Sequence, residues 1–169
     1  MQRIAVVQGA PGSVIQELFA ELVGRWRVDA DIAGVLAQSH GLADRACSAG
    51  YLDSIGSGER FAMFQNLGAG STGCHLEAAG VLTAAARVNE DIATGCDLVV
   101  LSKFGKLEAA GSGLRDAFAT AVAAGVPLLT SVAPALETEF QAVASSCYSV
   151  LPANTAAIAD WWNTVRKRR

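Results

Sequence analysis

Short apolar runs alternate with segments of helical periodicity along most of this chain. Runs bounded by Gly, Pro, Ser or Asp are typical of buried strands, and apolar residues three and four apart indicate helices. The predicted strands are 4–7, 32–36, 97–101, 127–132 and 147–151. The predicted helices are one that begins at the cap Ser13, and others at 76–94, 114–124, 136–144 and 155–168.

Residues 46–67 depart from this alternation. They hold two extended-looking stretches on either side of Gly56-Ser57-Gly58, with Tyr51, Phe61 and Phe64 among them. Aromatic residues favour strands, and a glycine-containing turn favours antiparallel pairing. This segment is therefore predicted to be a β-hairpin, and the sequence leaves open whether it acts as a lid.

The succession of strands and helices predicts an α/β fold with three layers, a mostly parallel sheet and helices on both of its faces. The 169 residues fit a single domain, 1–169, with the hairpin as an insertion. In such sheets, ligands bind beyond the carboxyl ends of the strands. Two loops are expected at that edge, residues 8–13 and 102–113.

The composition excludes two classes of protein. With 51% hydrophobic and 17% charged residues, the chain is too apolar to be disordered. A net charge of -3 gives no general attraction for phosphate backbones, so we expect no nucleic-acid partner. The basic cluster 166–169 is expected to be solvated.

No membrane partner is expected either, because no apolar run reaches the roughly 18 residues of a membrane helix. The beginning of the chain lacks the pattern of a signal peptide, so a cytoplasmic location is expected. The four cysteines form no C-x-x-C pair, which argues against a zinc or dithiol site. Cys96 and Cys147 are expected to be small buried side chains.

The first loop resembles a phosphate-binding Walker A loop with parts replaced. Gly9-Ala10-Pro11-Gly12-Ser13 follows the first strand and opens a helix, as in G-x-x-x-x-G-K-[ST]. Val14, Ile15 and Gln16 occupy the positions of the second Gly, the Lys and the hydroxyl. A helix N-terminus still offers N–H donors, so the loop could cradle an oxyanion. The alternative is a plain β–α turn.

The second loop gathers two Lys, one Glu, one Arg and three Gly over residues 103–115. Its strand ends in Ser102 and Lys103, where a Walker B strand has an acidic residue that holds Mg²⁺. Asp97 lies at the other end of the strand, roughly 15 Å away. Cations and glycines could hold an anion here; the alternative is a solvated connection. The candidate ligand-binding residues are Gly9, Pro11, Gly12, Ser13, Gln38, Ser102, Lys103, Phe104, Gly105, Lys106, Glu108, Gly111, Gly113 and Arg115.

The segment from Asp97 to Glu108, continuing through Gly111 and Gly113, resembles an uncharacterised bacterial family. Residues 34–38 and 73–77 also look like its recurring segments. That family is related to the small P-loop nucleoside-triphosphatases and is often encoded beside molybdate-uptake and molybdenum-cofactor genes. The resemblance implies a P-loop-like fold. In the true triphosphatases an Asp-Glu pair ends the strand, and here Ser102 and Lys103 stand in those positions, so the resemblance does not carry the hydrolase activity over.

Other residues raise weaker hypotheses. Cys74, His75 and Glu77 could hold a metal, although a simple helix start explains them better, and we assign no metal site. Cys74 could be reactive or a structural thiol. One of Trp161 and Trp162 is expected to pack on the sheet, with the other exposed or at a protein contact.

Three functions remain open. The leading hypothesis is an oxyanion- or phosphate-binding accessory protein on a degenerate P-loop NTPase scaffold, with molybdate, tungstate or a nucleotide as candidate ligands. Its link to molybdenum comes from the resemblance. The second is a divergent nucleoside-triphosphatase in which Lys103 replaces the loop lysine and Glu108 orients water or metal. The third is a regulatory partner that uses the last helix and the hairpin. No catalytic residue is assigned, and a homo-oligomer is left open.

Overall fold

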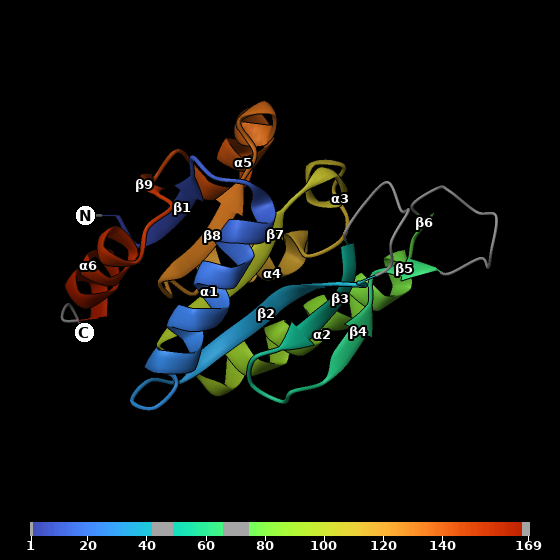
Figure 1. Ribbon diagram of the computed structural model, residues 1–169, viewed down its shortest axis with the longest axis horizontal. Coiled ribbons are helices and arrows are strands. Elements are labelled where there is room, and N and C mark those ends of the chain that lie inside the picture. The colour runs from blue at the N-terminus through green and yellow to red at the C-terminus, as the bar shows by residue number, and fades with distance from the viewer. Residues whose placement is uncertain (1, 42–48, 66–74, 167–169) are drawn as a thin grey trace.

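A seven-stranded sheet forms the centre of the computed structural model, which describes residues 2–41, 49–65 and 75–166 (Figure 1). The strand order is β4-β3-β2-β7-β8-β1-β9. The strands are β1 (Ile4–Gln8), β2 (Ile32–Ser39), β3 (Ala49–Ser54), β4 (Arg60–Ala62), β7 (Leu98–Phe104), β8 (Leu128–Val132) and β9 (Tyr148–Pro152), beside a separate pair, β5 (Phe64–Gln65) and β6 (His75–Leu76). The helices are α1 (Gly12–Trp26), α2 (Ala78–Thr94), α3 (Lys106–Ala109), α4 (Arg115–Ala123), η1 (Pro134–Leu136), α5 (Glu137–Ala144) and α6 (Thr155–Arg166).

Five of these strands are parallel, as the apolar runs predicted. β1 lies between β8 and β9 and pairs in parallel with both, while β7 pairs in parallel with β2 and β8. From β1 the chain crosses over β8 and β7 to reach β2, whereas from β8 it crosses β1 in the other direction to reach β9. The two connections diverge at the carboxyl ends of β1 and β8, where an open α/β sheet forms a crevice for ligands. This arrangement is consistent with a P-loop-like fold.

Helices cover both faces of the sheet and make two cores. On one face, α1 and α6 contribute Phe19, Leu22, Ile158 and Trp161 to a core with Leu98 and Val100 of β7. On the other face, α2, α4 and α5 pack on Val99, Leu101 and Phe104 of the same strand. From Leu98 to Leu101, successive residues of β7 thus face opposite layers, as the pleat of a strand requires, and the register shifts between Leu101 and Phe104.

β3 and β4 form an antiparallel pair around the turn that contains Gly56 and Gly58, and β3 also pairs antiparallel with β2. The side chains of Arg60 and Asp53 are joined across the pair by two hydrogen bonds of 2.7 and 2.8 Å. The hydrogen bonds and charge of Asp53 raise the pKa of Arg60 above its usual value. The pair extends the sheet beyond β2 at its edge.

Three local predictions were wrong. Pro11, rather than Ser13, is the cap of α1, because Pro11 is the last extended residue and Ser13 already lies in the first helical turn. Trp161 and Trp162 are both buried, since Trp161 Nε1 donates to Gln2 O at 2.9 Å and Trp162 packs 5.7 Å from Trp26 between α6 and α1. Cys147 is exposed in the turn before the edge strand β9.

The other helices and strands that were predicted begin and end close to their predicted boundaries. Cys96 is buried, as expected, and α2 ends at Gly95, whose φ of 103° is one that glycine adopts at low cost. β2 continues to Ser39 and β7 to Phe104, beyond the apolar runs that predicted them. Among the described helices none is long and apolar enough to cross a membrane.

Thr130 of β8 provides a stability prediction that does not depend on function. Its buried Oγ1 donates to the backbone O of Leu101 at 2.6 Å and ties β8 to β7. We expect Thr130→Val to lower the free energy of unfolding by about 1 kcal/mol, the typical net contribution of one hydrogen bond. Urea unfolding measures this difference; a variant as stable as the parent would contradict it.

Candidate functional site

The two loops predicted to share the carboxyl edge of the sheet approach one another there. A methyl group placed on Gly12, the first residue of α1, would lie 4.0 Å from Nζ of Lys103 near the end of β7. Lys103 is exposed and its Cε would lie 3.9 Å from a methyl group on Gly105. The ammonium of Lys103 therefore lies beside the N-terminus of α1, although the two residues are far apart in the sequence.

The N-terminus of α1 offers several free donors. The first intrahelical bond runs from the N–H of Ile15 to the carbonyl of Pro11, at 3.2 Å. The N–H groups of Gly12, Ser13 and Val14 precede it and have no acceptor within the helix. No side chain caps them and no acidic residue lies in the first turn. These groups and the positive end of the helix dipole make a favourable position for an anion.

Ile15, which stands at the position of the Walker A lysine, is buried. Only 4% of its surface is exposed, and it packs into the core beneath α1. Near the start of α1 the structure places instead the charge of Lys103, at the end of β7.

Ser102 lies directly before Lys103 and is 1% exposed. The peptide bond between the two residues is cis. Leu98 and Val100 face the layer of α1, and Ser102 is the next residue in that row. Its Oγ is buried and has no hydrogen-bond partner among the described residues.

Glu108 holds the second loop together from inside. One carboxylate oxygen accepts the N–H of Gly105 and the other accepts the N–H of Leu114, each at 2.8 Å. Arg115 Nη1 donates to the backbone O of Glu108 at 3.0 Å. A methyl group on Gly113 would lie 2.3 Å from Glu108 Oε1, so this glycine makes room for the carboxylate. Glu108 is 5% exposed and is engaged within the loop.

The remaining candidates are spread more widely than the sequence suggested. Phe104 packs on the opposite face of the sheet, 5.4 Å from Phe118 and 5.2 Å from Phe140 between ring centroids. Gln38 lines a separate cavity, with Arg27, which follows α1, and the turn of residues 54–58. Lys106 and Gly111 are exposed on the outside of the second loop. Of the candidates, the structure therefore brings together Gly12 of the first loop with Lys103 and Gly105 of the second.

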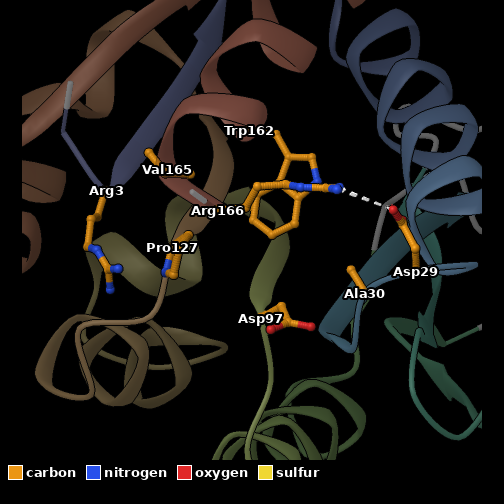
Figure 2. A pocket seen from close by; sticks show the side chains of 8 residues that line it. All are labelled: Arg3, Asp29, Ala30, Asp97, Pro127, Trp162, Val165 and Arg166. Atoms are coloured by element: carbon orange, nitrogen blue, oxygen red, sulfur yellow. Dashed lines mark hydrogen bonds and ion pairs between the residues drawn. The ribbon is translucent and has the colours of Figure 1, made fainter. Parts of the chain in front are cut away.

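Sequence reasoning missed a cavity of about 160 Å³ at the opposite edge of the sheet (Figure 2). Its lining residues are Arg3, Asp29, Ala30, Asp97, Pro127, Trp162, Val165 and Arg166. Figure 2 shows Arg166 of α6 directed at Asp29, to which it is paired at 3.3 Å. Arg3 donates to Gly125 O, and Asp97 accepts the N–H of Asp31 at 2.8 Å. These charged side chains join the elements around the cavity. The sequence feature that could have indicated the cavity is the presence of charged residues just before several strands.

The metal hypothesis for Cys74, His75 and Glu77 is not tested, because Cys74 lies outside the described residues. No group of three or more His, Cys, Asp and Glu side chains in the described part of the chain lies close enough to hold a metal ion. The ring of His40 packs 4.9 Å from Phe64.

The chain resembles part of a much longer curated protein, "Molybdenum import ATP-binding protein ModC 2" of Bradyrhizobium diazoefficiens. The two are 38% identical over 112 residues, which is 66% of this chain and 12% of that relative. The likeness points to a relationship with P-loop NTPases. No solved structure matches the chain.

A family model described as "Protein of unknown function (DUF2478)" matches residues 4–161, which includes the sheet, α1 and both loops. The chain therefore belongs to this family.

Proposed function

We propose that this chain is an accessory protein that binds an oxyanion or phosphate group on a degenerate P-loop NTPase scaffold, into which β3 and β4 are inserted. The ligand lies between the N-terminus of α1 and the end of β7. The observation that carries the proposal is the position of Lys103 Nζ, 4.0 Å from a methyl group placed on Gly12.

Three features of this position, which we call the cradle, favour the binding of an anion. The free N–H groups at the start of α1 donate hydrogen bonds, the helix dipole adds a partial positive charge, and Lys103 adds a full one. Each is modest alone, but they converge on one position. Within residues 9–13 and 102–115 the one acidic residue is Glu108, and its two oxygens accept backbone N–H groups.

The same observations favour binding over the alternative of Mg-dependent nucleotide hydrolysis. A hydrolase of this fold type uses a loop hydroxyl and a strand carboxylate to hold Mg²⁺. Gln16 and Ser102 stand at those positions here. Glu108, the alternative ligand for metal or water, is buried and occupied within its loop.

The candidate ligands include molybdate and tungstate. The relative's name refers to molybdenum import, and molybdate is a tetrahedral dianion with the shape of sulfate. We accordingly propose a role beside molybdenum uptake, with the small anion as the binding partner.

The proposal is tested by Lys103→Ala, with Lys106→Ala as the matched control. Removing the ammonium of Lys103 is expected to weaken anion binding about tenfold to a hundredfold, because charge-assisted hydrogen bonds contribute about 1.5–3 kcal/mol. Lys106, exposed on α3, is expected to change the affinity by less than about threefold. Calorimetry with molybdate, tungstate, sulfate, phosphate and Mg-ATP gives the dissociation constants.

Equal affinity in the parent and in Lys103→Ala would place the anion elsewhere. Turnover of Mg-ATP by the parent protein, lost in Lys103→Ala, would replace the binding function with the hydrolase.

A further inference from the structure

We propose that β9 pairs antiparallel with β9 of a second copy of this chain and thereby joins two seven-stranded sheets into one. The interaction surface is the outer edge of residues 148–152. Its partner is the same surface of an identical chain. The inference does not depend on the anion site, so each of the two can fail without the other.

β9 is one of the two strands at which the sheet ends (Figure 1). It pairs in parallel with β1 on its inner side, from Tyr148 to Pro152. Among the described strands, none lies on its outer side. A strand at the edge of a sheet presents a row of N–H and C=O groups without partners, and this row is a template for pairing with another strand. β9 therefore has the backbone groups that a further strand requires.

The two edges of the sheet differ in how they are protected against such pairing. Short length and charged side chains are common means by which an edge strand avoids another chain. β4, at the other edge, has three residues and carries the charged side chain of Arg60. β9 has five residues, and no charged residue occurs between Cys147 and Asn154. Pro152, which cannot donate, is the last residue of the strand and leaves residues 148–151 able to pair.

Val150, the middle residue of β9, adds an apolar side chain to this edge. It is 52% exposed and is the one large hydrophobic side chain that is exposed on a described strand. Tyr148 lies on the same face of β9, because side chains two residues apart share a face. α5 covers Tyr148, whose hydroxyl donates to Glu137 at 2.8 Å and whose ring packs 5.2 Å from that of Phe140. The cover of α5 thus protects the start of β9 and leaves Val150 half-exposed.

The absence of charge favours a second copy as the partner. An antiparallel pair of identical strands has a two-fold axis, so a charge at its centre would meet a like charge, which is destabilising. β9 has no such charge to prevent self-pairing. A pair centred on the middle of the strand places Val150 opposite the same residue of the second copy and removes both side chains from water. Because both copies use the same edge, the contact closes as a dimer.

Sedimentation equilibrium of the whole chain, from about 1 µM to about 1 mM, measures the association. One strand from each copy makes an interface smaller than the usual 1,600 Å² or so, and we therefore expect a dissociation constant on the order of 10–100 µM. Val150→Lys and Val150→Glu each bring like charges together and are expected to weaken the dimer at least about tenfold. An equimolar mixture of the two variants should restore it, because opposite charges then meet across the pair.

Val28→Lys is the matched control, since Val28 is 85% exposed in the turn after α1 and lies outside the strands. It should keep the dissociation constant of the parent. Restoration by mixing separates a lost contact from a lost fold, because unfolded chains would not form the dimer again. The proposal is overturned by a parent that stays monomeric over the whole range, by a dimer that survives Val150→Lys, or by a mixture that stays monomeric. A parent that pairs with a different protein and not with itself would overturn it too.

Discussion

Gly34→Ala is expected to destabilise the protein by more than about 4 kcal/mol, enough to prevent folding in many small proteins. Gly34 lies within β2, against β7 in the middle of the sheet. A methyl group on it would lie 1.9 Å from the backbone O of Val100, and its φ is +123°. The clash involves backbone of a central strand, which cannot move without opening the ladder between β2 and β7.

Gly58→Ala is the matched control for this variant. Gly58 also has a positive φ, of +73°, but a methyl group there would meet no atom within 4 Å. Its cost is limited to the backbone conformation and is expected to be about 1 kcal/mol. Urea unfolding, or the soluble yield where Gly34→Ala does not fold, distinguishes the two. Equal stability of the two variants would show that β2 can shift away from β7.

Glu108→Ala is expected to lower the free energy of unfolding by about 3–5 kcal/mol. The substitution leaves the N–H groups of Gly105 and Leu114 without their acceptor, and each buried unsatisfied donor costs about 1–3 kcal/mol. It also removes the carboxylate whose two hydrogen bonds connect the two ends of the segment 105–114. Amide hydrogen exchange at Gly105 and Leu114 should quicken together, because both depend on the same side chain.

Asp116→Ala controls for the loss of a negative charge near the start of α4. Asp116 is exposed in the first turn of that helix, so its removal should cost at most about 1 kcal/mol. Glu108→Gln should be intermediate, since an amide retains one acceptor oxygen and turns its NH₂ toward the other donor. If Glu108→Ala is as stable as Asp116→Ala, the carboxylate does not organise the loop, and a catalytic role for Glu108 would become the better explanation of its burial.

The succession of strands and helices could be predicted from the sequence because it depends on local periodicity. Apolar runs such as 97–101 have few alternatives to a buried strand, and a mostly parallel sheet follows from helices placed between strands. The replacement of the Walker lysine by Ile15 and of the strand carboxylate by Ser102 is equally a property of the sequence. These facts were sufficient to predict the edge of the sheet at which the candidate site lies.

Contacts between residues distant in the chain were decided by the tertiary structure. Lys103 approaches Gly12 because α1 begins beyond β1 and the connection crosses β8 and β7 on its way to β2, an arrangement set by the strand order rather than by any local pattern. Gln38 was expected near the same loops, but β2 pairs with β3 and presents it to another cavity. No spacing in the sequence distinguishes these two outcomes.

The burial of individual polar and aromatic side chains was decided in the same way. Glu108 was expected to face a ligand and instead bonds within its own loop, and both Trp161 and Trp162 are buried where one was expected to be exposed. A sequence shows which side chains can donate, accept or pack. Which of them do so depends on the layers that meet around them, because burial and hydrogen bonding are properties of packed neighbours and not of position in the chain.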